Sequence, residues 1–563
     1  MTASKMNVKK TKKIHEKRLT KKSEQQDLKL TEMLELMRQL TKEDERAIKE
    51  FLSPEKRLDG RYVTSEANLD KWIDPRIFRE TQIKRFLRWL TTAPPLFNLF
   101  FNWLFITKAG MKLSYFDQQE DKNLDKHYKK GTQHHIKERE DNFTIHNLGH
   151  ATQLIQTSGM NILTDPVFGD LAPFVYPATT KKFGRNYQAK DLPPIDVILI
   201  SHNHRDHVDV DSLKQLIKNA KTSNKPLPQL LVPKGDEDFF NELGFTQVRS
   251  FEWHEHITLK SETGLSVTFC SVPADHRSGR HGYDSHKSLV MGWTISPKNR
   301  NEILYFAGDT AKISDIRMDS LALDIYQLYL HKKALSDNEL PRLINMEPGG
   351  PNYTRKDMEP THQSAVDSII SSFRLAISLK SVCAAHQGET TEYSANNWLN
   401  ATASVFMHHN KYELGPDRFN ENVFIYSRLL SYLKMNDEQL QNHINKQQTK
   451  SSSWTLFHRK KDFIINGVKE LRQLAQQIWP EEQDPAVLNK KIVEFIEARV
   501  HFPLINEKVS SDDVFQFKQG QVSTIIPDTY ITDKHGGRKR KGAKEVVEEN
   551  INEEEASDFR IRK

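Results

Sequence analysis

One stretch of the chain decides its fold, VILISHNHRDH at residues 197–207. Its first four residues are apolar and mostly β-branched, a pattern that predicts a short buried strand. Three histidines and an aspartate follow directly, at the carboxyl end of this strand, where open α/β sheets place their functional sites. Imidazole and carboxylate side chains suit Zn²⁺ first, with Fe²⁺ or Mn²⁺ as alternatives. The stretch therefore predicts a strand that ends in a metal-binding loop.

The spacing inside this loop indicates two ions. His202 and His204 are two residues apart in extended chain, so their side chains can converge on the same ion. Asp206 and His207 are adjacent, so they point elsewhere and suggest a second ion. For the loop taken alone, a histidine-rich surface loop without metal is the other interpretation.

Three further apolar runs each end in a polar residue that could complete such a site. His276 follows the run 269–275, Asp309 follows 303–308 and His386 follows 381–385. We interpret each run as a strand that presents a ligand from its end. With the first loop, four strand ends would supply the ligands.

In its motifs the chain resembles the metallo-β-lactamase fold superfamily, in the branch of the N-acyl-phosphatidylethanolamine-hydrolysing phospholipase D and the related ascorbate-phosphate lactonases. The motifs occur in order over roughly residues 143–390: LGHAT at 148–152, ILTDPVF at 162–168, SHNHRDH at 201–207, PADHRSGR at 273–280 and FAGDT at 306–310. The resemblance implies an α/β fold, an αββα sandwich, with two zinc ions. It implies one ion held by His202, His204 and His276, a second by Asp206, His207 and His386, and Asp309 bridging both. Asp165 would steady the ligand loop from behind.

Some stretches depart from the family pattern. Residues 330–348 look like an insertion, and QGET at 387–390 replaces the family's usual Trp-Gly-Thr-Phe. The stretch MEPTH at 358–362 still resembles the family's methionine and histidine beside the metals, which makes His362 a candidate substrate-side residue. Alternatively, His362 belongs to a helix N-terminus with Thr361 as its cap and a buried apolar face at Ala365, Ile369 and Ile370.

These ligands predict a hydrolase that acts through a metal-bridging hydroxide. Two ions about 3.5 to 4 Å apart lower the pKa of the water between them from about 15.7 toward neutrality and stabilise charge on the attacked ester. Asp206, Asp309 and His362 are the candidate catalytic residues, with His362 able to protonate the leaving group. We favour a phospholipase D-type phosphodiesterase acting on N-acyl-phosphatidylethanolamine-like phospholipids. The alternatives are a lactonase-like hydrolase of a small phosphorylated ester, a nucleic-acid-processing metallo-hydrolase and a non-enzymatic effector.

The length of 563 residues predicts several parts rather than one domain. We expect a basic disordered tail (1–25), a helical arm with an apolar segment (26–140), the metal-dependent hydrolase domain (141–395), a helical accessory domain (396–530) and a charged disordered tail (531–563). The two cysteines, Cys270 and Cys383, lie in apolar runs, which favours core positions and a reducing compartment.

Charge and hydropathy bear on partners and location. The apolar run 96–106 is shorter than the about 20 residues that span a bilayer, and fits either a membrane-surface helix or a buried helix. The lysine-rich start lacks the apolar core of a secretory leader, which favours a cytoplasmic or peripheral-membrane protein. The basic runs at 9–22 and 537–541 could bind anionic lipid or nucleic acid, but the family motifs argue against nucleic acid. The glutamate-rich stretch 545–557 resembles the C-terminal export signals of bacterial type IV secretion effectors.

Overall fold

The structure is a computed structural model. It describes residues 55–56, 61–64, 136–169, 187–280, 284–333, 340–349, 361–387, 391–408, 421–436, 438–442, 458–501, 514–518, 521–525, 531–532 and 538–539. The helices predicted within 30–52, the apolar run 96–106 and most of both charged tails lie outside these residues, and those predictions stay predictions.

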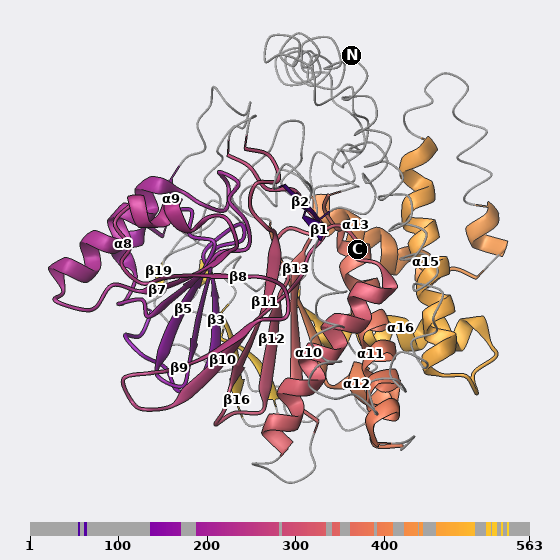
Figure 1. The fold of residues 1–563 in the computed structure, drawn as a ribbon. Helices are drawn as coiled ribbons and strands as arrows, with labels where there is room; N and C mark the ends of the chain where they lie inside the picture. Colours follow the sequence, from indigo (N-terminus) through magenta and orange to yellow (C-terminus); the bar gives the residue numbers. More distant parts are fainter. Residues whose placement is uncertain are drawn as a thin grey trace, which may run out of the picture.

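Two mixed β-sheets face each other and carry helices on their outer sides (Figure 1). The eight-stranded sheet has the order β17 (Gln521–Ile525), β16 (Val514–Lys518), β3 (Phe143–Asn147), β4 (Gln153–Thr157), β5 (Met160–Thr164), β6 (Val197–Leu199), β7 (Gln229–Pro233) and β8 (Val248–Phe251). The seven-stranded sheet has the order β15 (Val500–His501), β14 (Thr402–Met407), β13 (Arg342–Pro348), β12 (Glu302–Phe306), β11 (Met291–Pro297), β10 (Ser266–Pro273) and β9 (His256–Lys260). The αββα prediction is confirmed.

The two sheets repeat one arrangement. In the first, β3, β4 and β5 pair antiparallel, and β5 to β8 pair parallel. In the second, β9 to β12 pair antiparallel, and β12 to β15 pair parallel. The carboxyl ends of the parallel strands in each sheet therefore lie along one edge, where loops can bring ligands together.

Strand β6 shows why the eight-stranded sheet is buried on both faces. Val197 and Leu199 belong to the core between the sheets, whereas Ile198 and Ile200 pack against the helices outside. Because side chains alternate between the faces of a strand, a continuous apolar run serves both cores. The outer layer here consists of η1 (Ala189–Asp191), α8 (Val210–Thr222) and α9 (Glu237–Glu242).

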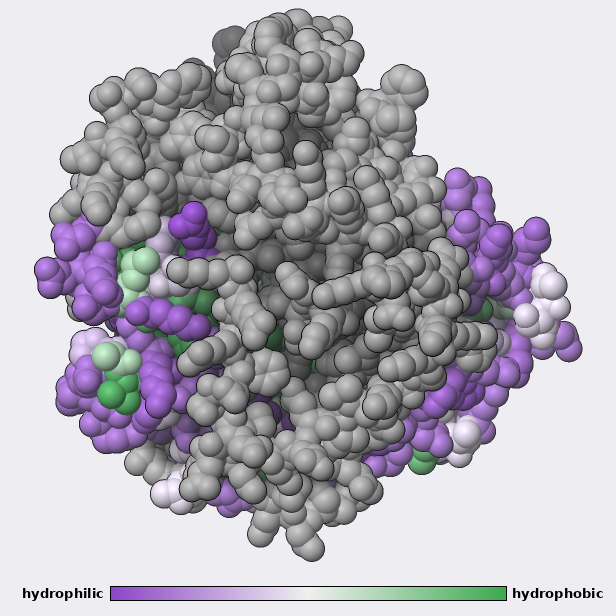
Figure 2. Space-filling view, turned by 180° about the vertical axis from the view of Figure 1, so that it is seen from behind, coloured by the Kyte–Doolittle hydropathy of each residue, from purple (hydrophilic) through white to green (hydrophobic). Residues whose placement is uncertain are grey.

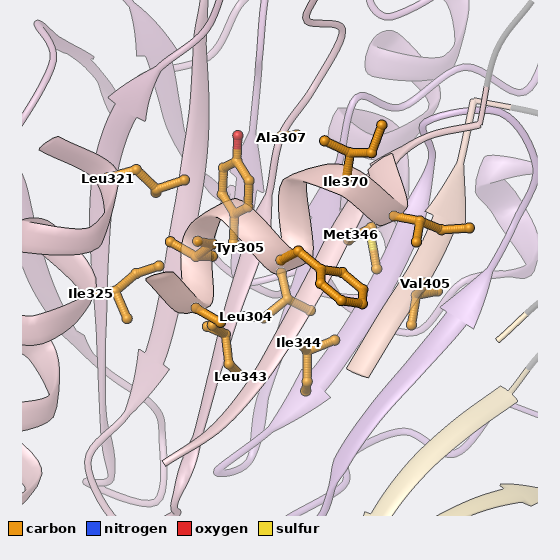
Figure 3. Packing of buried hydrophobic residues seen from close by; sticks show 14 of the residues in the cluster. Leu304, Tyr305, Ala307, Leu321, Ile325, Leu343, Ile344, Met346, Ile370 and Val405 are labelled. Atoms are coloured by element: carbon orange, nitrogen blue, oxygen red, sulfur yellow. The ribbon is translucent and has the colours of Figure 1, made fainter. Parts of the chain in front are cut away.

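A second helical layer covers the seven-stranded sheet. It comprises α10 (Asp315–Lys333), α11 (Ala365–Gln387), α12 (Ala395–Asn400), α13 (Glu421–Leu433), α15 (His458–Ile478) and α16 (Pro485–Arg499). Figure 3 shows Leu321 and Ile325 of α10 and Ile370 of α11 packed beside side chains of β12, β13 and β14. Helix α11 is long and apolar enough for a membrane span, but 72% of that window is buried inside the protein, as in the core helix of a globular domain.

Three expectations about this half of the chain were wrong. The run 381–385 is the last part of α11 and not a strand, because a short apolar run fits a buried helix as well as a strand. Residues 330–348 are not an insertion: they hold the end of α10 and the integral strand β13. The hydrolase fold does not stop at 395, because β14, β15 and β16 pair within its sheets.

The helices predicted beyond residue 420 are present as α13, α15 and α16, and they share one apolar core with the seven-stranded sheet. They therefore form a layer of the sandwich rather than a separate accessory domain. Where the described surface is visible in Figure 2 it is mostly hydrophilic. Among the described residues, the exposed large hydrophobic side chain is Leu330, at 37%.

Candidate metal centre

The loop that follows β6 is fixed at both of its ends. At its start, the indole of Trp293 donates to the carbonyl of Ile200 at 2.9 Å. The backbone of Met291 donates to the carbonyl of Ser201 at 3.0 Å. At its end, Asp209 caps α8 by accepting backbone hydrogen bonds from the first turn. The loop is thus anchored to the facing sheet on one side and to a helix on the other.

Asn203 and Arg280 brace the middle of this loop. The Asn203 amide donates to Asp236 at 2.7 Å and to Ser288 at 2.9 Å, so this side chain faces away from its two histidine neighbours. The Arg280 guanidinium donates to the carbonyls of Asn203 and Val208 at 3.1 and 2.8 Å. The motifs that contain them therefore hold the ligand loop in shape. The sequence did not reveal these bracing roles.

His202, His204 and His276 form the first ligand set. Nε2 of His202 lies 2.9 Å from Nδ1 of His204, and Nε2 of His276 lies 3.2 Å from that same atom. The three nitrogens point at a common position from two different sheets. The structure brings these residues together as predicted from the sequence.

Asp206, His207 and His408 form the second set, with His150 beside it. Nε2 of His207 and Nε2 of His408 lie 4.0 and 3.9 Å from Oδ2 of Asp206. His408 follows β14 directly, so it stands at a strand end like the other ligands. The sequence held that signal in the apolar run 402–407, and we missed it by assigning 396–530 to a separate domain.

Asp309 lies between the two sets. Its Oδ2 is 3.0 Å from Nε2 of His207 and 3.1 Å from Nε2 of His408. The same oxygen is 3.8 Å from Nε2 of His276 and 3.9 Å from Nε2 of His202. One carboxylate therefore faces both groups of imidazoles, which is the geometry required of a bridging ligand.

His386 does not stand at a strand end, because residues 365–387 are helical. The side chain of His386 lies outside the described residues, so its assignment as a ligand stays a prediction. His408 occupies the position beside Asp206 and His207 that we had assigned to His386.

Asp165 orients two of the histidines from behind, as expected. It accepts hydrogen bonds from Nδ1 of His207 at 2.7 Å and from the hydroxyl of Ser201 at 2.6 Å. Because the Ser201 proton is committed to Asp165, Nδ1 of His202, 3.0 Å away, donates to the Ser201 oxygen. Nε2 of both imidazoles therefore faces the centre, where a metal would replace any proton on it.

Close packing and unusual backbone angles hold these residues in place. Gly308, next to Asp309, has φ +61°, and a Cβ there would lie 2.4 Å from Cβ of Ser201. Asp165, His150 and His408 adopt positive φ of 36°, 57° and 61° without being glycine. Left-handed backbone at such residues concentrates at functional sites, where the surrounding structure enforces it.

The electrostatics prepare the centre for cations. Burial lowers the pKa of His202 and of His276 well below the usual range, and lowers the pKa of His204 to about 3. Burial alone would raise the pKa of Asp309, but the charges of His207 and His408 hold it well below its usual range. The first set therefore offers neutral imidazole nitrogens beside an ionised carboxylate, the protonation states that a metal needs.

The donor set fits two divalent cations. Oδ1 of Asp309 is buried, with no hydrogen-bond partner among the residues that the structure describes. Nε2 of His202 and Nε2 of His276 both converge on Nδ1 of His204, at 2.9 and 3.2 Å, so a cation between the three nitrogens would take the place of a shared proton. Imidazole and carboxylate with no cysteine suit Zn²⁺, Fe²⁺ or Mn²⁺.

His362 lies in the centre and not at a helix cap. Its Nε2 is 3.0 Å from Oδ2 of Asp309, and its Nδ1 is 2.9 Å from the hydroxyl of Thr361. Helix α11 begins at Ala365, three residues after His362, and its first turn is capped by Ser364, which exchanges hydrogen bonds with Asp367. The cap assigned to Thr361 was therefore wrong, and the substrate-side position of His362 is the interpretation that the geometry favours.

Comparison with known proteins agrees with this geometry. Residues 160–360 match the family described as Beta-lactamase superfamily domain. This part of the chain is a metallo-β-lactamase superfamily domain. The matched residues contain six of the candidate ligands: His202, His204, Asp206, His207, His276 and Asp309. His150 and His408 lie outside the matched residues.

Two curated relatives are similar over the same region. The mitochondrial N-acyl-phosphatidylethanolamine-hydrolyzing phospholipase D of Saccharomyces cerevisiae is 32% identical over 169 residues, 30% of this chain and 34% of that protein. N-acyl-phosphatidylethanolamine-hydrolyzing phospholipase D 1 of Caenorhabditis elegans is 33% identical over 170 residues, 29% of this chain and 45% of that protein. The match thus spans between about a third and a half of these relatives.

Solved structures show a more distant likeness. A metallo hydrolase from Ignicoccus hospitalis has 17% identity and a TM-score of 0.27, over 48% of this chain and 83% of that one. An isothiocyanate hydrolase from Delia radicum gut bacteria has 15% identity and a TM-score of 0.32, over 51% of this chain and 92% of that one.

Proposed function

We propose that the protein is a binuclear metal-dependent hydrolase. His202, His204 and His276 would hold one ion, Asp206, His207 and His408 the other, and Asp309 would bridge them. The observation that carries the proposal is the single Asp309 oxygen that faces the nitrogens of four proposed ligand histidines at 3.0 to 3.9 Å. Zinc is the proposed metal, because imidazole and carboxylate ligands suit it and because hydrolysis needs no change in the oxidation state of the metal.

When bound, the ions would supply a water of lowered pKa and would polarise the ester oxygen that is attacked. The residues of the chain supply the rest. Asp309, ionised and buried, can accept the proton of the attacking water. His362, with Nε2 3.0 Å from Asp309, can receive that proton and pass it to the leaving group. Cys270 and Cys383 are buried, and this scheme uses neither as a nucleophile.

The proposed substrate is a phosphodiester in an N-acyl-phosphatidylethanolamine-like phospholipid, cleaved on the headgroup side of the phosphate. The motifs around the ligands and the two phospholipase D relatives support this class. Arg277 adds to the case, because it is exposed next to His276 and its positive charge acts on both His204 and His276. A cation at this position favours an anionic ester over a neutral one.

Metal-free protein reloaded with zinc, iron or manganese tests the proposal. We expect close to two ions per chain and release of phosphatidic acid from vesicles that contain N-acyl-phosphatidylethanolamine. His204→Ala should lose both metal and turnover, whereas His331→Ala, an exposed histidine on α10, should keep both. Cleavage of a small soluble phosphodiester with no action on vesicles would replace the lipid by a small ester. A fully loaded protein that cleaves no ester would refute the hydrolase.

A further inference from the structure

A short segment far ahead of the superfamily domain docks on the metal centre. Residues 61–64 include β2 (Tyr62–Val63), which pairs with β1 (Glu55–Lys56). Tyr62 is 4% exposed and belongs to the core between the sheets, and Thr64 is 1% exposed. The sequence had placed this segment in a helical arm, so both its strand and its burial differ from the expectation.

The segment lies against the connection between β10 and β11, which carries His276. The backbone of Tyr62 donates to the carbonyl of His286 at 2.8 Å, and Arg61 donates to the carbonyl of Ser285 at 3.2 Å. The hydroxyl of Thr64 donates to the main-chain carbonyl of His276 itself. A residue outside residues 160–360 thus contacts a proposed ligand directly.

Arg317 of α10 locks Thr64 in place. Its guanidinium donates to the carbonyl of Thr64 at 2.8 Å and lies 4.9 Å from the centre of the Trp253 ring. It also lies 3.6 Å from the carboxylate of Asp275, the residue before His276. Thr64 and Asp275 are therefore held by the same partly buried cation.

The side chain and the main chain of His276 are fixed by different parts of the protein. Nδ1 of the imidazole donates to the carbonyl of Thr361 at 2.7 Å, which sets the plane of the ring. The Thr64 hydroxyl fixes the peptide that carries the ring. A ligand must be held within about 0.5 Å of its productive position, so a shift of this peptide would move Nε2 out of the first set.

We propose that Thr64 is a positioning residue of the metal centre, and that the N-terminal segment 61–64 is a working part of it. Through His276, this segment would set the affinity of the first ion. The inference rests on the proposed binuclear centre and goes beyond it, since it makes metal binding depend on chain outside the superfamily domain. Partners behind a ligand typically change metal affinity by about 10- to 100-fold.

Two substitutions at residue 64 isolate the hydroxyl. Thr64→Val keeps the shape and removes the donor, whereas Thr64→Ser keeps the donor. The matched control is Thr402→Val, because Thr402 is also 1% exposed and its hydroxyl also donates to a carbonyl, that of Trp398, at 2.8 Å. Zinc content is measured at equilibrium with a graded chelator, alongside the melting temperature of the metal-free proteins and the visible spectrum of the cobalt-loaded ones.

We expect Thr64→Val to bind one of its two ions about 10- to 100-fold more weakly and to change the cobalt spectrum. Thr64→Ser and Thr402→Val should match the unsubstituted protein in both measurements. Unchanged affinity in Thr64→Val, or an equal loss in Thr402→Val, would overturn the positioning role. An unsubstituted protein that takes up no zinc would instead refute the centre itself. If Thr64→Val does not fold, Arg61→Gln provides the same measurement, with weaker binding of one ion expected and unchanged binding counting against the proposal.

Discussion

Replacing His408 by asparagine should cost the protein one of its two ions. His408 is 4% exposed, and its Nε2 lies 3.1 Å from Asp309 and 3.9 Å from Asp206. Asparagine is the right substitute because His408 has φ 61°, a left-handed conformation that asparagine tolerates and alanine does not. The backbone then stays in place while the nitrogen ligand is lost.

The size of the effect follows from the number of ligands. Four-ligand zinc sites bind with about 10 to 16 kcal/mol, or about 3 kcal/mol per ligand. The second set has four protein ligands, Asp206, His207, His408 and Asp309, so losing one should weaken binding there by about 100-fold. The first ion, held by three other histidines and Asp309, should be affected much less.

Metal content after dialysis against a graded chelator measures this effect, and His386→Ala is the companion variant. We expect a chelator range in which the unsubstituted protein and His386→Ala keep two ions and His408→Asn keeps one. If His386→Ala loses the ion and His408→Asn retains both, the ligand assignment made from the geometry is wrong and the one made from the sequence is right.

Three further outcomes follow from the same structure. Asp165→Asn should weaken zinc binding by about 10- to 100-fold, because it changes the group that accepts hydrogen bonds from His207 and Ser201. An unchanged zinc affinity in a chelator competition would show that these hydrogen bonds do not contribute to metal binding. Gly308→Ala should lower the free energy of unfolding by about 3 kcal/mol in a urea titration, because the added Cβ meets Ser201 and the backbone is left-handed; a change below about 1 kcal/mol contradicts this. Burial lowers the pKa of Lys332 from 10.5 to about 7, so above pH 7 the unfolded state binds more protons than the folded state and stability rises with pH. The unfolding free energy of the protein relative to Lys332→Met should therefore increase by roughly 3 kcal/mol from pH 7 to 9.5, and a decrease over this range would reverse the sign of our argument.

The sequence predicted the part of the centre that is local in the chain. Val197 to Ile200 could be recognised as a strand from four residues, and the histidines that follow it needed no knowledge of the rest of the fold. His276 and Asp309 were found by the same rule, because β10 and β12 are apolar runs with a polar residue at the end. Six of the seven predicted ligand positions meet in the described structure.

The seventh position, His386, was placed at the end of a strand that is not there, for a physical reason. The run before His386 and the run before His408 are both short and apolar, and nothing within either run tells a buried helix from a buried strand. The length of the whole element distinguishes the two, and the helix before His386 can be recognised only when all 23 residues from Ala365 to Gln387 are considered together. The choice also depended on β13, because once residues 342–348 are taken for an insertion, the strand that pairs with them has no place in the sheet.

The domain boundary at 395 failed for a related reason, and its failure explains the architecture of the centre. The loop after β6 belongs to the eight-stranded sheet, whereas β10, β12 and β14 belong to the seven-stranded one. An ion bound by His202, His204 and His276 would therefore join the two sheets at the edge where their apolar core ends. At this edge the hydrogen bonds from Trp293 and Met291 to the β6 loop already link the sheets directly. A centre built across two sheets draws its ligands from strands that lie far apart in the chain. His408, which follows β14, completes the second set from outside residues 160–360, and Thr64 supports the first set from the other end of the chain.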